Sequence, residues 1–492
     1  MMNSSAKKMG ASNIALFCLC AVIVIDTLTA SASIGVSSIG WWLVTLVIFV
    51  IPYGLITSEL STSYPGDGGI YDWVKKAFGY KWAVRTTWFY WINVGLWMPA
   101  VYIMFAGMFA ELFYPDLSLF WQIIICIILT WLTILICNVS VDIGVWVTNI
   151  GALLKITVIS VLGIGGFIYA MNNGVANEFS LSNMMPSFDS GIEFLPALVF
   201  NLMGFELVAT LTREMKDVRD MPKAVFLSIG ITAFLYIFGT VGILMALPAD
   251  QIGLVAGIID TLKTLFGDSA IGNVLVKTIG TLALLTFIGN MVSWTMGASR
   301  AAAEAASEGE LPDYVGKMSP KFNTPIGANF ITGMLSTLVI IAYAVFAQSS
   351  DDLFWSVFAF SSCVFLLPYL FMFPAYLKLR MSEPDVIRPF KVPGNNTVQW
   401  LMSIVCFFVI AQSVVLFIFP EIFSGEIVWS YTAPVLLGVL LTIAIGEYIL
   451  HLAIIKKSQN CDSSTISTLD LNGELQYGKD TYPNRTRLSY AW

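Results

Sequence analysis

Long apolar segments recur along almost the whole chain, and they limit its fold more than any other feature. About twelve of them approach or exceed the roughly 20 residues that a helix needs to cross a bilayer. Lipid offers no hydrogen-bond partners to the backbone, so each segment must satisfy its own as a helix. The expected bounds are 13–36, 40–62, 86–112, 119–138, 144–171, 193–212, 224–247, 273–298, 325–348, 353–377, 399–420 and 430–454. We therefore expect an all-α polytopic membrane protein.

The composition agrees with this and excludes several functions. Of the 492 residues, 57% are hydrophobic and 12% charged, whereas a soluble chain carries about 25% charged residues. The net charge of −7 gives no indication of a nucleic-acid partner. The seven cysteines have no C-x-x-C spacing, and His451 is the only histidine. These counts predict no cofactor and no metal site, and they argue against an enzyme.

Charge in the connecting loops predicts the orientation. Lys and Arg gather in alternate loops, as at Lys75, Arg213 and Arg388, while the intervening loops are acidic, as at Asp250. Under the positive-inside rule this places both termini in the cytoplasm of a plasma-membrane or inner-membrane protein. Residues 1–12 would form a cytoplasmic N-terminus, and the polar segment 455–492 would form a disordered cytoplasmic tail.

Three ionisable residues stand out inside the predicted spans, well away from the span ends: Asp26, Lys155 and Glu206. A charge at mid-membrane costs roughly 2.5–3.5 kcal/mol, so each is a candidate functional residue. Each also has a structural interpretation. Asp26 could be a protonated or paired packing residue, Glu206 could cap broken backbone, and Lys155 could extend its ammonium toward the cytoplasm.

The first and sixth spans contain segments that are poorly suited to continuous helix. Residues 25–35 are small and hydroxylated and end in glycine, and Gly204 interrupts the sixth span. Ser and Thr compete for backbone hydrogen bonds, and glycine adds conformational entropy. We therefore expect both helices to lose regular winding there. The candidate substrate-binding residues are Asp26, Thr27, Ser31, Ala32, Ser33, Phe200, Gly204, Phe205 and Glu206.

The position of these two spans suggests a repeat. If residues 13–171 and 193–377 each form five helices, the first and sixth spans are equivalent, the second unit is inverted, and 399–454 adds two helices. Transporters built in this way bind substrate at mid-membrane, where the paired helices break. Free amides at one half-helix end attract a carboxylate and free carbonyls at the other attract an ammonium, so an α-amino acid could bind there.

Five motifs, in order along the chain, resemble those of amino acid–polyamine–organocation transporters. They are PGDGGIYDW at 65–73, GFE at 204–206, EMKDVRDMP at 214–222, SR at 299–300 with GELP at 309–312, and RPFKVPG at 388–394. Asp217-Val218 stands where the family pattern has Asn-Pro. Within the superfamily, residues 51–55 and Ser293-Trp294 are most similar to the glutamate:GABA antiporter branch.

The resemblance implies a LeuT-type five-plus-five inverted repeat with two extra helices, and secondary active transport by alternating access. Phe200 matches the aromatic residue that closes over substrate. Lys155 matches a fifth-helix lysine that replaces a sodium ion in many members, which implies sodium independence. The first helix lacks the family's G-S-G break, and Asp26 in its region would favour an amine-bearing substrate or carry a coupling proton.

Three functions remain open on this basis. The first is an amino acid carrier working by exchange with an amino acid or amine, or by proton symport. The second is a polyamine or amine transporter. The third is an amino acid sensor that binds without transporting.

Overall fold

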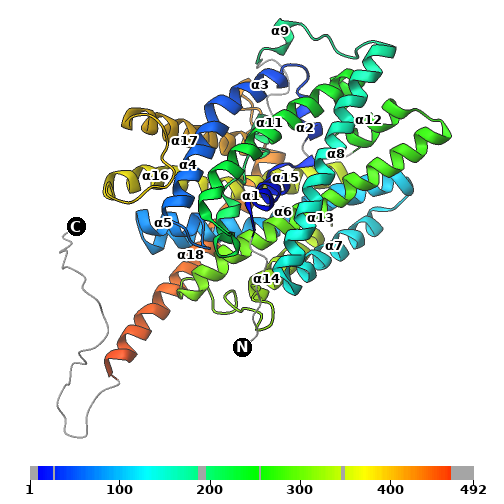
Figure 1. Ribbon diagram of the computed structural model, residues 1–492. Helices are drawn as coiled ribbons and strands as arrows, with labels where there is room; N and C mark the ends of the chain where they lie inside the picture. The colour runs from blue at the N-terminus through cyan, green and yellow to red at the C-terminus, as the bar shows by residue number, and fades with distance from the viewer. Residues whose placement is uncertain (1–8, 26–27, 187–194, 254–255, 345–349, 467–492) are drawn as a thin grey trace, which may run out of the picture.

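The computed structural model describes residues 9–25, 28–186, 195–253, 256–344 and 350–466, and within them it is helical, without strands (Figure 1). The first half contains α1 (Ala11–Val22), α2 (Leu28–Ser33), α3 (Ser38–Thr45), η2 (Leu46–Val50), α4 (Ile51–Ser63), α5 (Ile70–Phe78), α6 (Tyr80–Phe113), α7 (Leu119–Val139), α8 (Val141–Asn173) and α9 (Leu181–Met184). The second half contains α10 (Leu195–Phe200), η4 (Leu207–Glu214), η5 (Val218–Asp220), α11 (Met221–Ala246), η6 (Ala249–Gln251), α12 (Gly257–Phe266), α13 (Ala270–Ser307), α14 (Ile326–Ala344), α15 (Ser350–Leu366), α16 (Tyr369–Ser382), α17 (Asn396–Ile418), η7 (Ile422–Ser424) and α18 (Trp429–Ile466).

Nine helical segments in the described part are long and apolar enough to cross a membrane. They are Ser38–Ser63, Tyr80–Phe113, Leu119–Val139, Val141–Asn173, Val218–Ala246, Ala270–Ser307, Val357–Ser382, Asn396–Ile418 and Trp429–Ile455. The other predicted crossings correspond to the shorter α14 and to two interrupted helices, α1 with α2 and α10 with η4. The predicted polytopic all-α architecture is therefore confirmed.

Local sequence sets several helix ends. The Ser140 and Ser269 hydroxyls accept backbone N–H bonds at the starts of α8 and α13, and the Asn395 side chain does so for α17. Such caps satisfy amides that have no partner within the helix. At the far end of α8, Gly174 has a φ of +85°, a conformation that favours glycine.

Two helices run further than the sequence predicts. Helix α13 continues from the expected end at 298 to Ser307, through a stretch rich in alanine, the strongest helix former. Helix α18 continues past 454 to Ile466, so the proposed disordered tail begins too early. Each added residue gains a backbone hydrogen bond on a turn already formed, which makes such extensions favourable. Residues 467–492 lie outside the described part of the chain.

The helices divide into a buried centre and a lipid-facing ring. Helix α1 lies near the middle of the bundle and packs against α8, α11 and α13, whereas α7 and α17 lie toward its edges (Figure 1). Ring helices expose large apolar side chains, such as Trp146 on α8, Phe408 on α17 and Leu441 on α18. In a membrane these side chains contact acyl chains, so their exposure is what lipid requires.

A contact between glycines brings two central helices together. A Cβ atom added at Gly289 of α13 would lie 3.0 Å from the Cα of Gly151 on α8. Small residues allow membrane helices to approach this closely. The approach brings Lys155, one turn after Gly151, and Asn290 to the same end of α1.

Candidate functional site

The first broken helix ends at Val22, where the chain becomes extended at Ile23 (φ −73°, ψ 115°). The last carbonyls of α1 have lost their helical partners and take side-chain donors instead. Trp294 Nε1 donates to the Ala21 carbonyl at 3.0 Å, and the Tyr236 hydroxyl donates to Val22 at 3.1 Å. The Tyr236 oxygen also accepts the Val24 N–H at 2.7 Å. Two neighbouring helices, α11 and α13, thus stabilise the break.

Lys155 provides the charge at this end of α1. Its buried ammonium donates to the carbonyl of Cys20 at 2.6 Å and also to that of Ile23. The Asn290 amide donates to Cys20 as well, at 2.9 Å. A cation beside the C-terminal carbonyls of a helix interacts favourably with the helix dipole. Lys155 therefore holds the break in the first helix from within, and does not extend toward an aqueous surface.

The second broken helix ends at Phe200 and resumes at Leu207. Gly204 between them has a φ of +115°, and a Cβ atom there would lie 2.8 Å from the Trp294 ring. Both facts require glycine, because L side chains rarely adopt this backbone conformation. The Gly204 N–H donates to the Tyr53 hydroxyl at 3.1 Å.

Glu206 lies in this interruption with its carboxylate held by three tyrosines, which we call the tyrosine cage. Tyr90 donates to Oε1 at 2.8 Å, Tyr369 donates to the same oxygen at 2.7 Å, and Tyr53 donates to Oε2. All four side chains are buried. The three hydroxyl groups give both carboxyl oxygens hydrogen-bond partners in a buried position.

A narrow cavity lies beside the cage. Its walls are the rings of Trp97, Phe200, Trp294 and Phe365, with Ala21, Val24, Asn93 and Met203. The rings pack edge to face, with centroids 5.5 Å apart for Trp97–Phe200 and 5.0 Å apart for Trp294–Phe365. The Phe365 ring also contacts the Tyr369 ring at 5.3 Å, which links the cavity to the cage. The cavity is too narrow to admit a water molecule, so these rings must separate before a ligand can enter.

Two wall residues have buried polar atoms without a hydrogen-bond partner among the described residues: the Trp97 indole N–H and the side-chain amide of Asn93. Asn93 is 1% exposed, and within the described part of the chain neither its amide nitrogen nor its amide oxygen has a hydrogen-bond partner. An unpaired buried polar group costs about 1–3 kcal/mol. An amide that offers both a donor and an acceptor into an aromatic cavity is suited to orienting a polar ligand.

The structure separates the candidates that the sequence grouped together. Phe200 lines the cavity, and Gly204, Phe205 and Glu206 form the interruption below it. Asp26 and Thr27 lie outside the described residues. The Ser31 hydroxyl accepts a hydrogen bond from Asn201 Nδ2 at 3.3 Å, which joins the two broken helices.

The break in the first helix comes earlier than expected. Ser31, Ala32 and Ser33 belong to α2, and none of them lines the cavity. Ala32 is buried, and the Ser33 hydroxyl donates to Thr29 at 3.0 Å and toward Ile252 at 3.3 Å. The interruption instead begins at Ile23, where donors from other helices compensate the freed carbonyls. These carbonyls thus already accept side-chain donors, and their expected binding of a substrate ammonium stays a prediction.

Several residues of the site carried no signal in the sequence. The tyrosines of the cage look like interfacial or packing aromatics, and Asn93 is a single polar residue in the aromatic third span. Asn290 and Tyr236 likewise lie in otherwise apolar spans. Trp294 stands out in the sequence only through the family resemblance of Ser293-Trp294. For Asn93 and Asn290, the sequence offers one indication of a functional role, namely a polar residue within an apolar span.

Two interrupted helices at the centre of a multi-pass bundle define the class of protein: a membrane transporter of the LeuT-type fold. An amino acid permease family model matches residues 10–444, and the chain belongs to this family. The fold is similar to that of a manganese transporter mutant of Eremococcus coleocola, with a TM-score of 0.57 at 11% identity, covering 90% of this chain and 94% of the other. The family and its relatives are transporters, and the chain is not an enzyme.

Three relatives show what the family includes. A probable agmatine/putrescine antiporter, AguD, of Lactococcus lactis is 32% identical over 451 residues, covering 91% of this chain and 96% of the relative. An uncharacterised transporter of Legionella pneumophila is 30% identical over 85% of this chain and 91% of the relative. A probable polyamine transporter of Arabidopsis thaliana is 24% identical over 73% of this chain and 68% of the relative. The glutamate:GABA branch stays a prediction.

Proposed function

We propose that the chain exchanges small cationic amines across the cytoplasmic membrane by alternating access, without sodium. The observation that carries this proposal is the unpaired Asn93 amide in a cavity of aromatic rings, with the Glu206 carboxylate in the adjoining tyrosine cage. Aromatic faces attract cations, and a buried carboxylate adds to that attraction. The relatives named for agmatine, putrescine and polyamines support the same class of substrate.

Lys155 supports sodium independence. Its ammonium bonds the carbonyls of Cys20 and Ile23, so a fixed positive charge already occupies the end of the broken helix. A sodium ion at the same carbonyls would meet a like charge within bonding distance. We therefore assign Lys155 a positioning role and expect no sodium requirement.

Amino acid exchange is the second candidate, favoured by the match to an amino acid permease model. Amino acid binding has one requirement that amine binding lacks, a partner for the substrate carboxylate.

Proton symport would need a group that gains and loses a proton during the cycle, and Asp26 is the candidate for that role. In this proposal both termini face the cytoplasm, as the loop charges predict.

Transport by reconstituted protein tests the proposal. Proteoliposomes loaded with unlabelled putrescine or agmatine should take up the labelled amine rapidly, and uptake should persist when choline replaces sodium. Empty vesicles should take up little, because an exchanger needs a substrate on both sides. Parallel vesicles loaded with amino acids distinguish the second candidate. Strict dependence on sodium, or equal uptake by empty vesicles, would overturn the proposal.

Replacing Asn93 tests the site itself. Asn93→Leu has a similar volume but offers no donor or acceptor, so we expect about a tenfold or greater rise in the amine concentration for half-maximal exchange, since each 1.4 kcal/mol lost is tenfold. Asn149→Leu on α8 is the matched control. The Asn149 Nδ2 atom donates to Asn13 Oδ1 at 3.3 Å, and Asn149 does not line the cavity. An unchanged concentration in the Asn93 variant would place the ligand elsewhere.

A further inference from the structure

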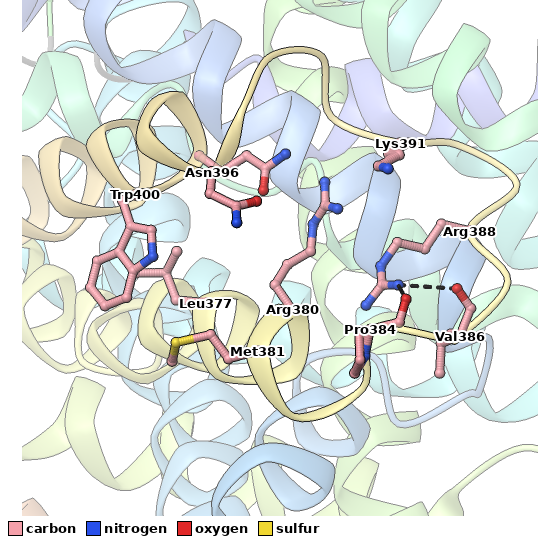
Figure 2. A pocket seen from close by; sticks show the side chains of 10 residues that line it. Leu377, Arg380, Met381, Pro384, Val386, Arg388, Lys391, Asn396 and Trp400 are labelled. Atoms are coloured by element: carbon pink, nitrogen blue, oxygen red, sulfur yellow. Dashed lines mark hydrogen bonds between the residues drawn. The ribbon is translucent and has the colours of Figure 1, made fainter.

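A second cavity, of about 570 Å³, lies far along the chain from the transport site, where α16 ends and α17 begins. Its polar walls come from Arg380, Arg388, Lys391, Asn396 and Gln399. Figure 2 shows the Arg380 guanidinium directed between Asn396 and Lys391, with Trp400 on the opposite side from Arg388. The candidate transport site does not include this cavity, although two of its residues, Arg388 and Lys391, belong to the RPFKVPG motif.

The charges around this cavity do not cancel. Glu59 of α4 lies beneath it and pairs with Arg380 at 2.8 Å and with Arg388 at 3.2 Å. Its second oxygen accepts hydrogen bonds from Arg380 Nη2 and from the Val392 N–H. One carboxylate thus faces two guanidinium groups and Lys391, which leaves an excess of positive charge. The nearby Glu383 does not line the cavity and pairs with Lys76 at 3.3 Å.

The cationic groups differ in how many of their N–H donors are already bonded within the protein. Arg388 is fully engaged, because its Nη1 and Nη2 atoms donate to the carbonyls of Pro384, Val386, Leu379 and Glu383. Arg388 therefore fixes the loop. The Arg380 guanidinium lies over the Tyr376 ring, with Cζ 5.8 Å from the ring centroid. Among the described residues, its Nη1 atom and the exposed Lys391 ammonium make no ion pair with a carboxylate. These two groups are available to an anion.

The start of α17 adds further donors. Asn395 caps this 23-residue helix, and Asn396 is its first residue and lines the cavity. Helix N-termini present free amides and a positive dipole end to an anion. Together, two cations, the Asn396 amide and the helix start form a set of donors directed into one cavity.

We propose that this cavity binds a phosphate group, and that the group belongs to an anionic phospholipid headgroup. An Arg guanidinium and a Lys ammonium are the common phosphate ligands in proteins. The rim favours a lipid, because Trp400 at 43%, Ile404 at 41% and Phe408 at 64% exposure follow one another at four-residue spacing down α17. This stripe would carry an acyl chain away from the headgroup. Free phosphate shares the same chemistry and is the other source.

Native mass spectrometry of the full purified chain distinguishes these sources. Titration with phosphatidylglycerol should give bound lipid at lower concentration than titration with phosphatidylcholine, whose headgroup carries no net charge. Lys391→Glu should weaken phosphatidylglycerol binding about tenfold, the loss expected for one charge-assisted hydrogen bond. Lys81→Glu is the matched control, because Lys81 is an exposed lysine at the start of α6, outside the cavity.

A second variant distinguishes a loss of binding from a loss of folding. Asn396→Asp places a carboxylate in the cavity, yet acidic residues stabilise the first turn of a helix, so the fold should tolerate it. It should weaken the lipid as Lys391→Glu does. An unfolding temperature raised by inorganic phosphate alone, and lost in both variants, supports the site with free phosphate as its ligand. Equal binding of both lipids would overturn the proposal. So would a second outcome, in which Lys391→Glu and Asn396→Asp bind phosphatidylglycerol as Lys81→Glu does and phosphate does not change the unfolding temperature.

Discussion

Lys155 holds the end of the first broken helix although it does not line the cavity. Its ammonium and the Asn290 amide converge on the carbonyls that α1 leaves without helical partners. The charge is buried and has carbonyl partners. Removing either the ammonium or the carbonyls would leave the other group buried without a partner. Its role is therefore to keep the first helix broken in a defined geometry.

Lys155→Ala should lower the free energy of unfolding by about 1–3 kcal/mol or more, the cost of leaving buried polar groups unsatisfied. Lys277→Ala is the control, because Lys277 is an exposed lysine on α13. Chemical or thermal unfolding of the purified variants measures the difference. Equal stabilities would show that the Asn290 bond alone suffices at the break.

Asp72 of α5 gives a prediction on pH. Burial, reinforced by the nearby Glu304 charge, raises the pKa of Asp72 from its usual 3.8 to about 6, although the Gly68 N–H favours the charged form. A raised carboxyl pKa means that the folded chain holds this proton more tightly than the unfolded chain. The stabilisation is complete below about pH 3.8 and is lost as pH rises through about 6.

Asp72→Asn should remove that dependence, since an amide does not titrate in this range. The unfolding temperature of the wild type, relative to the variant, should fall between about pH 4 and pH 6. Asp142→Asn at the exposed start of α8 is the control. Parallel curves for wild type and Asp72→Asn would mean that Asp72 titrates normally in the folded protein.

The residues that sequence could single out differ from those it could not in a simple physical way. Lys155 and Glu206 are costly in lipid, and Gly204 is costly in a helix, so each is conspicuous in an apolar span. Tyr53, Tyr90 and Tyr369 are ordinary there, and only folding brings their hydroxyls to one carboxylate. The composition of a single helix does not show which of its side chains meet side chains from other helices.

At the level of elements, the two interruptions have different causes. The sixth helix breaks where its own sequence requires it, at a glycine with positive φ. The first helix breaks at Ile23, although residues 31–35 are weaker helix formers and residues 28–33 remain helical. Side-chain donors from α8, α11 and α13 stabilise the free carbonyls at the earlier position, so packing overrides propensity. The position of the first break therefore could not follow from local sequence.

Gly204→Ala should be destabilising and should abolish exchange. The new methyl group would meet Trp294 at 2.8 Å in a backbone conformation that alanine avoids, at a cost of about 1–3 kcal/mol. Gly230→Ala in α11 is the control, since that position has open space and helical geometry, where alanine gains about 1 kcal/mol. Unfolding and exchange assays on both variants measure the contrast. Full activity of Gly204→Ala would show that the interruption is not needed.

Across the whole molecule, one face is closed by ion pairs between segments distant in sequence. Arg300 of α13 is 8% exposed and pairs with Glu214 at 3.1 Å and with Asp67 at 3.6 Å. Asp67 also accepts the Arg213 N–H at 3.0 Å, and the Met9 N–H donates to the Glu214 carbonyl at 2.7 Å. The N-terminal segment, the loop after α4 and the end of the broken sixth helix thus meet at Arg300. The alternating access proposed above would require this face to open.

Arg300→Ala should therefore shift the protein toward a state open on this face, because both carboxylates lose their shared cation. A loss of about 1.4 kcal/mol from the closed state would raise the open population about tenfold. Cys18 and Cys20 on α1 are buried, so their modification by a maleimide, followed by peptide mass spectrometry, reports opening. Arg85→Ala is the control, because Arg85 pairs with Glu447 between α6 and α18. Labelling at the wild-type rate in Arg300→Ala would mean that packing of the helices, and not this ion-pair cluster, keeps the face closed.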